Sequence, residues 1–72
     1  MSAFPAPSLD DLQALARRHE EAKRACRWSE EVRLEHEILF LGNRLVQRGI
    51  ASVTEARDAI AAGRDGVRGK EL

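Results

Sequence analysis

The chain has 72 residues, which is enough for one small domain, and a domain of this size buries only about 60% of the surface that its unfolded form exposes. Its twelve basic and twelve acidic side chains cancel, whereas a dedicated binder of nucleic acid or of an anionic membrane usually carries a basic excess. Cys26 is the only cysteine, so no disulfide within the chain can support the small core, and self-association is the device that remains.

The sequence also argues against membrane insertion and secretion. No uninterrupted apolar run is longer than four residues, as in Ile38–Leu41, and a bilayer-spanning helix needs roughly 20. The opening stretch, MSAFPAPS, lacks the basic and apolar regions of a signal peptide. A single cysteine fits a reducing compartment, so we expect a cytoplasmic protein that contacts no membrane.

A first helix is predicted over residues 9–26, after an arm of residues 1–7. Pro5 and Pro7 favour extended backbone in this arm. Ser8 is a favourable N-cap, and the acidic residues that follow it suit the positive end of a helix dipole. One face of the predicted helix then collects small and apolar side chains with one histidine: Leu9, Leu12, Leu15, Ala16, His19, Ala22 and Cys26.

A second helix is predicted over residues 30–48, after a turn at 27–29. Ser29 would be its N-cap, and two glutamates follow in the first turn. No glycine or proline marks this turn, so one continuous helix through residue 48 remains an alternative. Gly49 stands where a C′ cap is expected, with Ile50 next to it as in a Schellman motif.

A third, shorter helix is predicted over residues 53–62. Ser52 opens the sequence S-V-T-E, which is a capping box, and Gly63 is expected to end the helix. The glycine-rich, charged stretch 64–72 is then a flexible tail. The single helical domain would span residues 8–63.

The second predicted helix carries two apolar stripes, whereas a surface helix of a small protein normally carries one. We define an inner stripe that the first helix can cover, consisting of Leu34, Ile38, Leu41 and Leu45. We define an outer stripe on the adjacent face, consisting of Val32, Leu39, Gly42 and Val46.

The expected fold is therefore all-α, an antiparallel helical hairpin with a short third helix. The third helix is too short to cover the whole outer stripe, and Gly42 would let a second backbone approach closely. We expect two chains to pack through the outer stripe into a homodimeric helical bundle. The alternative is a monomeric three-helix bundle in which the third helix covers this stripe.

The sequence contains no pattern that predicts catalysis or metal binding. His19 and Cys26 share one face but lie about 10 Å apart along a helix, too far to hold one metal ion. CxxC, HxxxH, HExxH, GxSxG and phosphate-binding glycine motifs do not occur. We expect a non-enzyme without metal or cofactor, with Cys26 buried and His19 hydrogen-bonded across the hairpin to Glu35. A pH switch at His19 is the alternative.

Trp28, Phe40 and Arg44 are the residues expected to contact a protein partner. Trp28 stands at the tip of the hairpin, and Phe40 lies on neither apolar stripe. Aromatic and arginine side chains are the usual anchors of interfaces, and Arg44 follows Phe40 by one helical turn. The alternative is that Phe40 packs within the chain, on the third helix or on Phe4 of the arm.

The expected function is non-catalytic: a small regulator, inhibitor or adaptor that occupies the surface of another, unidentified protein. In size and plan the chain resembles the short helical accessory proteins that phages direct against host factors, and its alanine and arginine usage indicates a bacterial or phage source. The alternative function is a small nucleic-acid-binding regulator, and a third is a structural subunit of a larger assembly. Nucleic acid would contact the basic face of the first helix through Arg17, Arg24 and Arg27, although acidic residues share that face.

Overall fold

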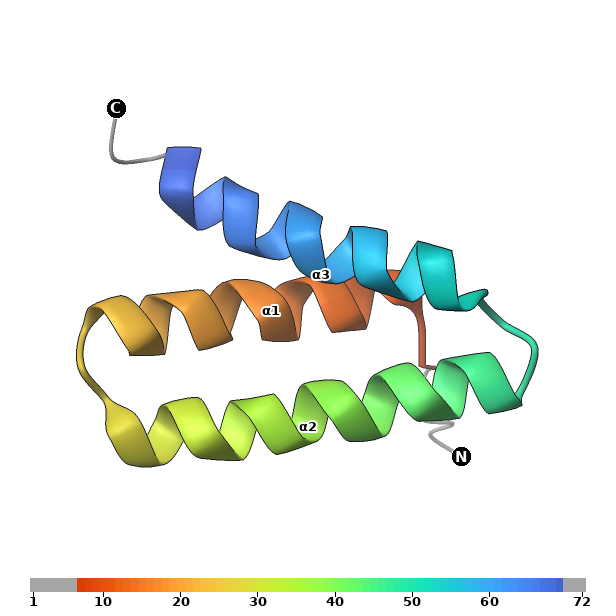
Figure 1. Ribbon diagram of the computed structural model, residues 1–72, viewed down its shortest axis with the longest axis horizontal. Helices are drawn as coiled ribbons and strands as arrows, with labels where there is room; N and C mark the ends of the chain where they lie inside the picture. Colours follow the sequence, from red (N-terminus) through yellow and green to blue (C-terminus); the bar gives the residue numbers. More distant parts are fainter. Residues whose placement is uncertain (1–6, 70–72) are drawn as a thin grey trace, which may run out of the picture.

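The computed structural model describes residues 7–69, and within this range the chain forms three α-helices and no strand. The helices are α1 (Leu9–Arg24), α2 (Trp28–Gln47) and α3 (Val53–Arg68). α1 runs opposite to α2 and has α3 on its other side (Figure 1). The prediction of an all-α fold with three packed helices is confirmed.

Two capping boxes begin α1 and α3 at the serines predicted from the sequence. The Asp11 amide donates to Ser8 Oγ at 3.4 Å, and the Ser8 amide donates back to the Asp11 carboxylate at 3.1 Å. Ser52 and Glu55 exchange the equivalent bonds at 3.1 and 3.0 Å. Each box satisfies amide groups that have no partner inside the helix, so both helix starts are fixed by local chemistry.

A left-handed cysteine closes the turn between α1 and α2. Cys26 has φ 57°, and the Arg27 amide donates to the Ala22 carbonyl at 2.9 Å, which is the Schellman arrangement. Only glycine adopts this backbone conformation without a steric penalty, so a left-handed residue could not be predicted at a cysteine. Cys26 is exposed, and the prediction that it is buried is wrong, because α1 ends before the helix can turn it toward the core.

The start and end of α2 differ in how well they were predicted. Gly49 has φ 72°, and the Ile50 amide donates to the Leu45 carbonyl at 3.0 Å, which confirms the predicted Schellman cap. The start was predicted wrongly, since α2 begins at Trp28 and its N-cap residue, Arg27, makes no side-chain capping bond. The turn itself separates two helices, so the alternative of one continuous helix is excluded.

Gly63 lies inside α3 and does not end it. The helix continues to Arg68. The glycine serves packing instead, because it lets α3 approach α1 closely. A Cβ atom at Gly63 would overlap the Gln13 carbonyl oxygen and lie 2.9 Å from the Ala16 Cβ. The predicted helix end at residue 62 is therefore wrong. Residues 64–68 are helical and not part of a tail, whereas residues 70–72 and the arm residues 1–6 lie outside the described range.

Large side chains fill the α1–α2 contact, and small ones fill the α1–α3 contact. Leu12, Leu34 and Leu45 are fully buried, and the predicted burial of the inner stripe is confirmed except that Leu41 is only half-buried. α3 packs mainly on α1 and diverges from α2 beyond their connecting turn (Figure 1). Val32 and Leu39 of the outer stripe remain exposed, whereas Gly42 and Val46 are half-buried, so the third helix covers this stripe only in part.

We predict opposite effects for alanine at two glycines of α3. Gly63→Ala should lower the free energy of unfolding by about 1–3 kcal/mol, because the added methyl group overpacks the α1–α3 contact. Gly66→Ala is the control, since a Cβ there meets no atom within 4 Å, and it should raise stability by up to about 1 kcal/mol through helix propensity. Urea denaturation followed by circular dichroism measures both, and equal gains at the two positions would contradict the close contact.

We also predict that Cys26→Gly stabilises the protein. Glycine removes the left-handed strain of the turn and should add about 1 kcal/mol to the free energy of unfolding. Cys26→Ala is the matched control, because it removes the thiol but keeps the Cβ atom that causes the strain. A gain from alanine as large as the gain from glycine would show that the thiol, and not the backbone, is the source.

Candidate protein-interaction surface on helix α2

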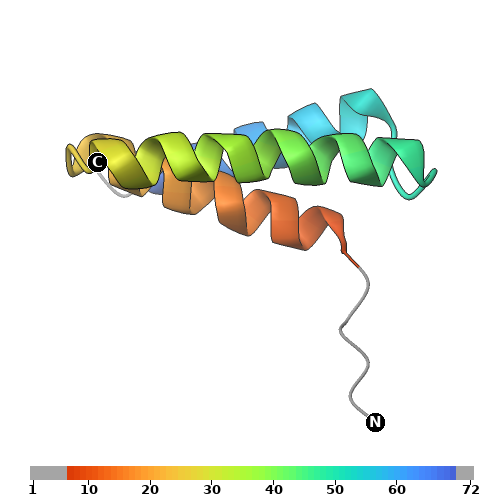
Figure 2. The ribbon, with the colours of Figure 1, turned by 90° about the horizontal axis from the view of Figure 1, so that it is seen from below.

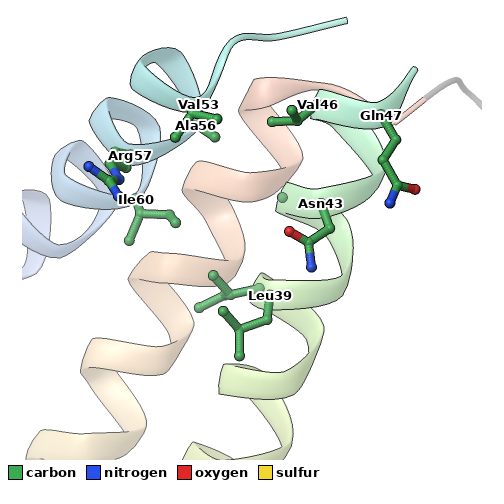
Figure 3. A pocket seen from close by; sticks show the side chains of 10 residues that line it. Leu39, Asn43, Val46, Gln47, Val53, Ala56, Arg57 and Ile60 are labelled. Carbon is green, nitrogen blue, oxygen red and sulfur yellow. The ribbon is translucent and has the colours of Figure 1, made fainter. Parts of the chain in front are cut away.

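A groove of about 350 Å³ lies between α2 and α3 where the two helices diverge (Figure 3). Its lining is mostly apolar. α2 contributes Leu39, Gly42 and Val46, which are three of the four residues predicted to form a dimer interface. α3 contributes Val53, Ala56 and Ile60. The residues of α2 that the sequence grouped on one stripe therefore do share one concave surface.

The apolar side chains along this surface are exposed to an unusual degree. Leu39 is 60% exposed, Val53 53% and Val32, which continues the stripe beyond the groove, 51%. Single exposed apolar residues are ordinary, but these form a row. Val32, Leu39 and Val46 recur every seven residues, so they lie along one line of the helix. A contiguous apolar surface of this kind is typical of an interaction site.

Phe40 and Arg44 form a second exposed cluster on another face of α2. The Arg44 guanidinium carbon lies 5.9 Å from the centroid of the Phe40 ring, within cation–π range. Phe40 is 68% exposed and borders a shallow depression between α1 and α2. The alternative in which Phe40 packs on the third helix is therefore wrong, and a contact with Phe4 lies outside the described residues.

Trp28 does not belong to the same cluster as Phe40. Twelve residues separate them, which is about 18 Å along an α-helix and about 120° around it. Trp28 is 76% exposed, and its helical position falls on the line of the outer stripe. The three residues predicted as one partner surface are thus divided, with Phe40 and Arg44 together and Trp28 on the outer stripe.

Two of the three arginines considered for nucleic-acid binding lie beside carboxylates. Arg24 Nε donates to Glu20 Oε2 at 3.0 Å, and Arg27 Nη1 lies 3.6 Å from Glu30 Oε2. Arg17 is exposed on α1. Carboxylates this close reduce the positive potential that Arg24 and Arg27 offer to phosphate groups.

Glu20 is the charged residue that the sequence interpretation misplaced. It is only 4% exposed, although it is one of the acidic residues assigned to the basic face of the first helix. Besides Arg24, its carboxylate lies 3.9 Å from Arg68 Nε on the last turn of α3. This contact could not be anticipated, because residue 68 was assigned to a flexible tail.

His19 is buried, but its predicted partner is elsewhere. The side chain is 7% exposed, and within residues 7–69 its Nδ1 atom has no hydrogen-bond partner. Glu35 is exposed on α2, and within the described residues no hydrogen bond joins it to His19. Across the described residues, no three His, Cys, Asp or Glu side chains are grouped to hold a metal ion. No helix in that range is long and apolar enough to cross a membrane.

Comparisons of the chain with protein families, with curated proteins and with solved structures gave no match. The functional interpretation therefore depends on the surfaces of α2.

We predict that Phe40 contributes little to folding. Phe40→Ala should lower the free energy of unfolding by less than about 1 kcal/mol, because most of the ring is already in water. Ile38→Ala is the control two residues away, and because Ile38 is only 5% exposed, its loss should cost about 2–5 kcal/mol. Urea denaturation at one protein concentration compares them, and a large loss for Phe40→Ala would place the ring in the core.

Proposed function

We propose that this protein is a non-catalytic protein–protein interaction module that associates with itself through the outer stripe of α2. The observation that supports this is the row of apolar side chains at Val32, Leu39 and Val46, of which Val32 and Leu39 are exposed and Val46 is half-buried at the groove. Full burial of a valine or leucine side chain is worth about 1.5–3 kcal/mol relative to exposure. Covering the row by a second protein surface would recover this free energy.

The small core supports a second copy as the first partner. Among the described residues, the large side chains that are fully buried are Leu12, Leu34 and Leu45, which is little for an independently stable fold. Two copies packed through α2 would bring their α1 and α2 helices together as a four-helix bundle with ordinary packing geometry. Each copy would thereby extend the core of the other.

The wider role we propose is that of a small regulator, inhibitor or adaptor that occupies the surface of another protein. Phe40 and Arg44 support this role, because they lie off the outer stripe and stay exposed when that stripe is covered. An aromatic ring beside an arginine is a common interface anchor. Nucleic-acid binding through Arg17, Arg24 and Arg27 ranks second, because Arg24 and Arg27 are each close to a carboxylate.

We predict that the wild-type protein sediments as a dimer and that Leu39→Glu makes it a monomer. Each chain has a mass of 8.0 kDa, so analytical ultracentrifugation at tens of micromolar should report twice that mass. A glutamate at residue 39 would bury an unpaired charge in the proposed interface. Circular dichroism of the same samples shows whether the dissociated chain keeps its helices.

Phe40→Glu is the matched control for this experiment. It introduces the same charge at the next residue, which is as exposed as Leu39 but lies on another face, so the dimer mass should be kept. A monomeric wild-type protein would contradict the proposed self-association. A dimer that survives Leu39→Glu but not Phe40→Glu would place the interface on the Phe40 face.

A further inference from the structure

The outer stripe has the spacing of a helix-pairing seam. Including Trp28 and Glu35, its positions are separated by four, three, four, three and four residues: Trp28, Val32, Glu35, Leu39, Gly42 and Val46. This alternation is the heptad pattern by which one helix packs along another. The surface that would complement this seam is therefore a second helix with an apolar stripe. Glu35 is the charged position on the seam.

The two halves of the seam differ in shape. The wall formed by α3 borders the half that contains Leu39, Gly42 and Val46 (Figure 3). The half that contains Trp28 and Val32 has no wall, because α3 packs on α1 and is far from α2 at that end (Figures 1 and 2). One half of the seam is thus a groove and the other a ridge. When the α2 helices of two copies run antiparallel, the ridge half of each copy meets the groove half of the other.

The charges of the two halves also differ. The ridge half carries Glu31 and Glu35, whereas Arg57 of α3 lines the groove half (Figure 3). Among the described residues, neither Glu35 nor Arg57 has an ion-pair partner. Antiparallel packing brings the Glu35 side of one copy to the Arg57 wall of the other. Parallel packing would place the two Glu35 carboxylates together on the seam, and like charges in a desolvated contact are costly.

We infer that the groove between α2 and α3 receives α2 of a second copy, in antiparallel orientation, about a two-fold axis close to Leu39. This inference rests on the proposed self-association and adds its geometry. Val32 of each copy then lies near Val46 of the other. Trp28 of each copy reaches the end of the groove at Val53, which accounts for the exposure of both side chains in the single chain.

Orientation is tested by cross-linking single-cysteine variants in a Cys26→Ser background. Chains carrying Val32→Cys and Val46→Cys are mixed, one of them isotope-labelled, and treated with a short bis-maleimide reagent. The expected product joins residue 32 of one chain to residue 46 of the other, with little product from either variant alone. Products that join residue 32 to residue 32 would show parallel helices and overturn the inference, while leaving the self-association intact.

Leu39→Cys distinguishes a failure of the antiparallel arrangement from a failure of the proposed self-association. Residue 39 lies opposite itself in either orientation, so this variant should cross-link to itself whenever the outer stripe is the interface. Its failure to do so, in a protein of monomeric mass, would overturn both the proposed function and the inference.

A charge exchange tests the role assigned to Arg57. Arg57→Glu should raise the dimer dissociation constant by at least about tenfold, and adding Glu35→Arg should restore most of the affinity. Asp58→Arg is the control, because it changes the neighbouring charge outside the groove lining and should leave affinity within about threefold. An unrescued double variant, with helicity unchanged, would contradict the pairing of Glu35 with Arg57 and overturn the antiparallel arrangement that places them together.

Discussion

The close contact between α1 and α3 at Gly63 determines how the rest of the chain is arranged. A Cβ atom at this position would meet the backbone of α1, so the glycine is what lets α3 approach α1 closely at this point. Because α3 is held there, it meets α2 only near their connecting turn. The contact between α1 and α3 thereby leaves Val32 and Leu39 of the outer stripe exposed.

Helix α2 therefore carries two apolar stripes, and each stripe follows its own phase of a seven-residue repeat. The inner stripe follows one heptad phase and is covered by α1, which stabilises the fold. The outer stripe follows a second phase and has only the α3 wall near its end. Two heptad phases on one helix are typical of a helix between two neighbours, and this chain supplies only one full neighbour. The surplus of apolar surface is thus a property of the α2 sequence and not a consequence of poor packing.

Features set by local chemistry could be predicted from the sequence, whereas features set by contacts distant in sequence could not. Ser8, Ser52 and Gly49 cap their helices as expected, because capping depends on residues within one turn. Gly63 was interpreted as a helix end by the same local rule, but its role is close packing against α1. Cys26 adopts a conformation that glycine favours, so composition gave no indication of it. The apolar residues of the outer stripe could be predicted from their spacing. Their exposure could not, because it depends on α3 packing mainly on α1 and not on α2.

The composition of the seam limits how strongly it can bind and favours one orientation. Glu35 and Gly42 replace apolar side chains at two of its positions, so less apolar area is covered than in a seam of leucines, and affinity falls accordingly. A charged seam residue also penalises every arrangement that leaves it without an opposite charge. In the proposed dimer Arg57 supplies that charge only when the helices are antiparallel. The same residue that weakens association therefore selects its geometry, much as a single polar seam residue fixes register in other helical pairs.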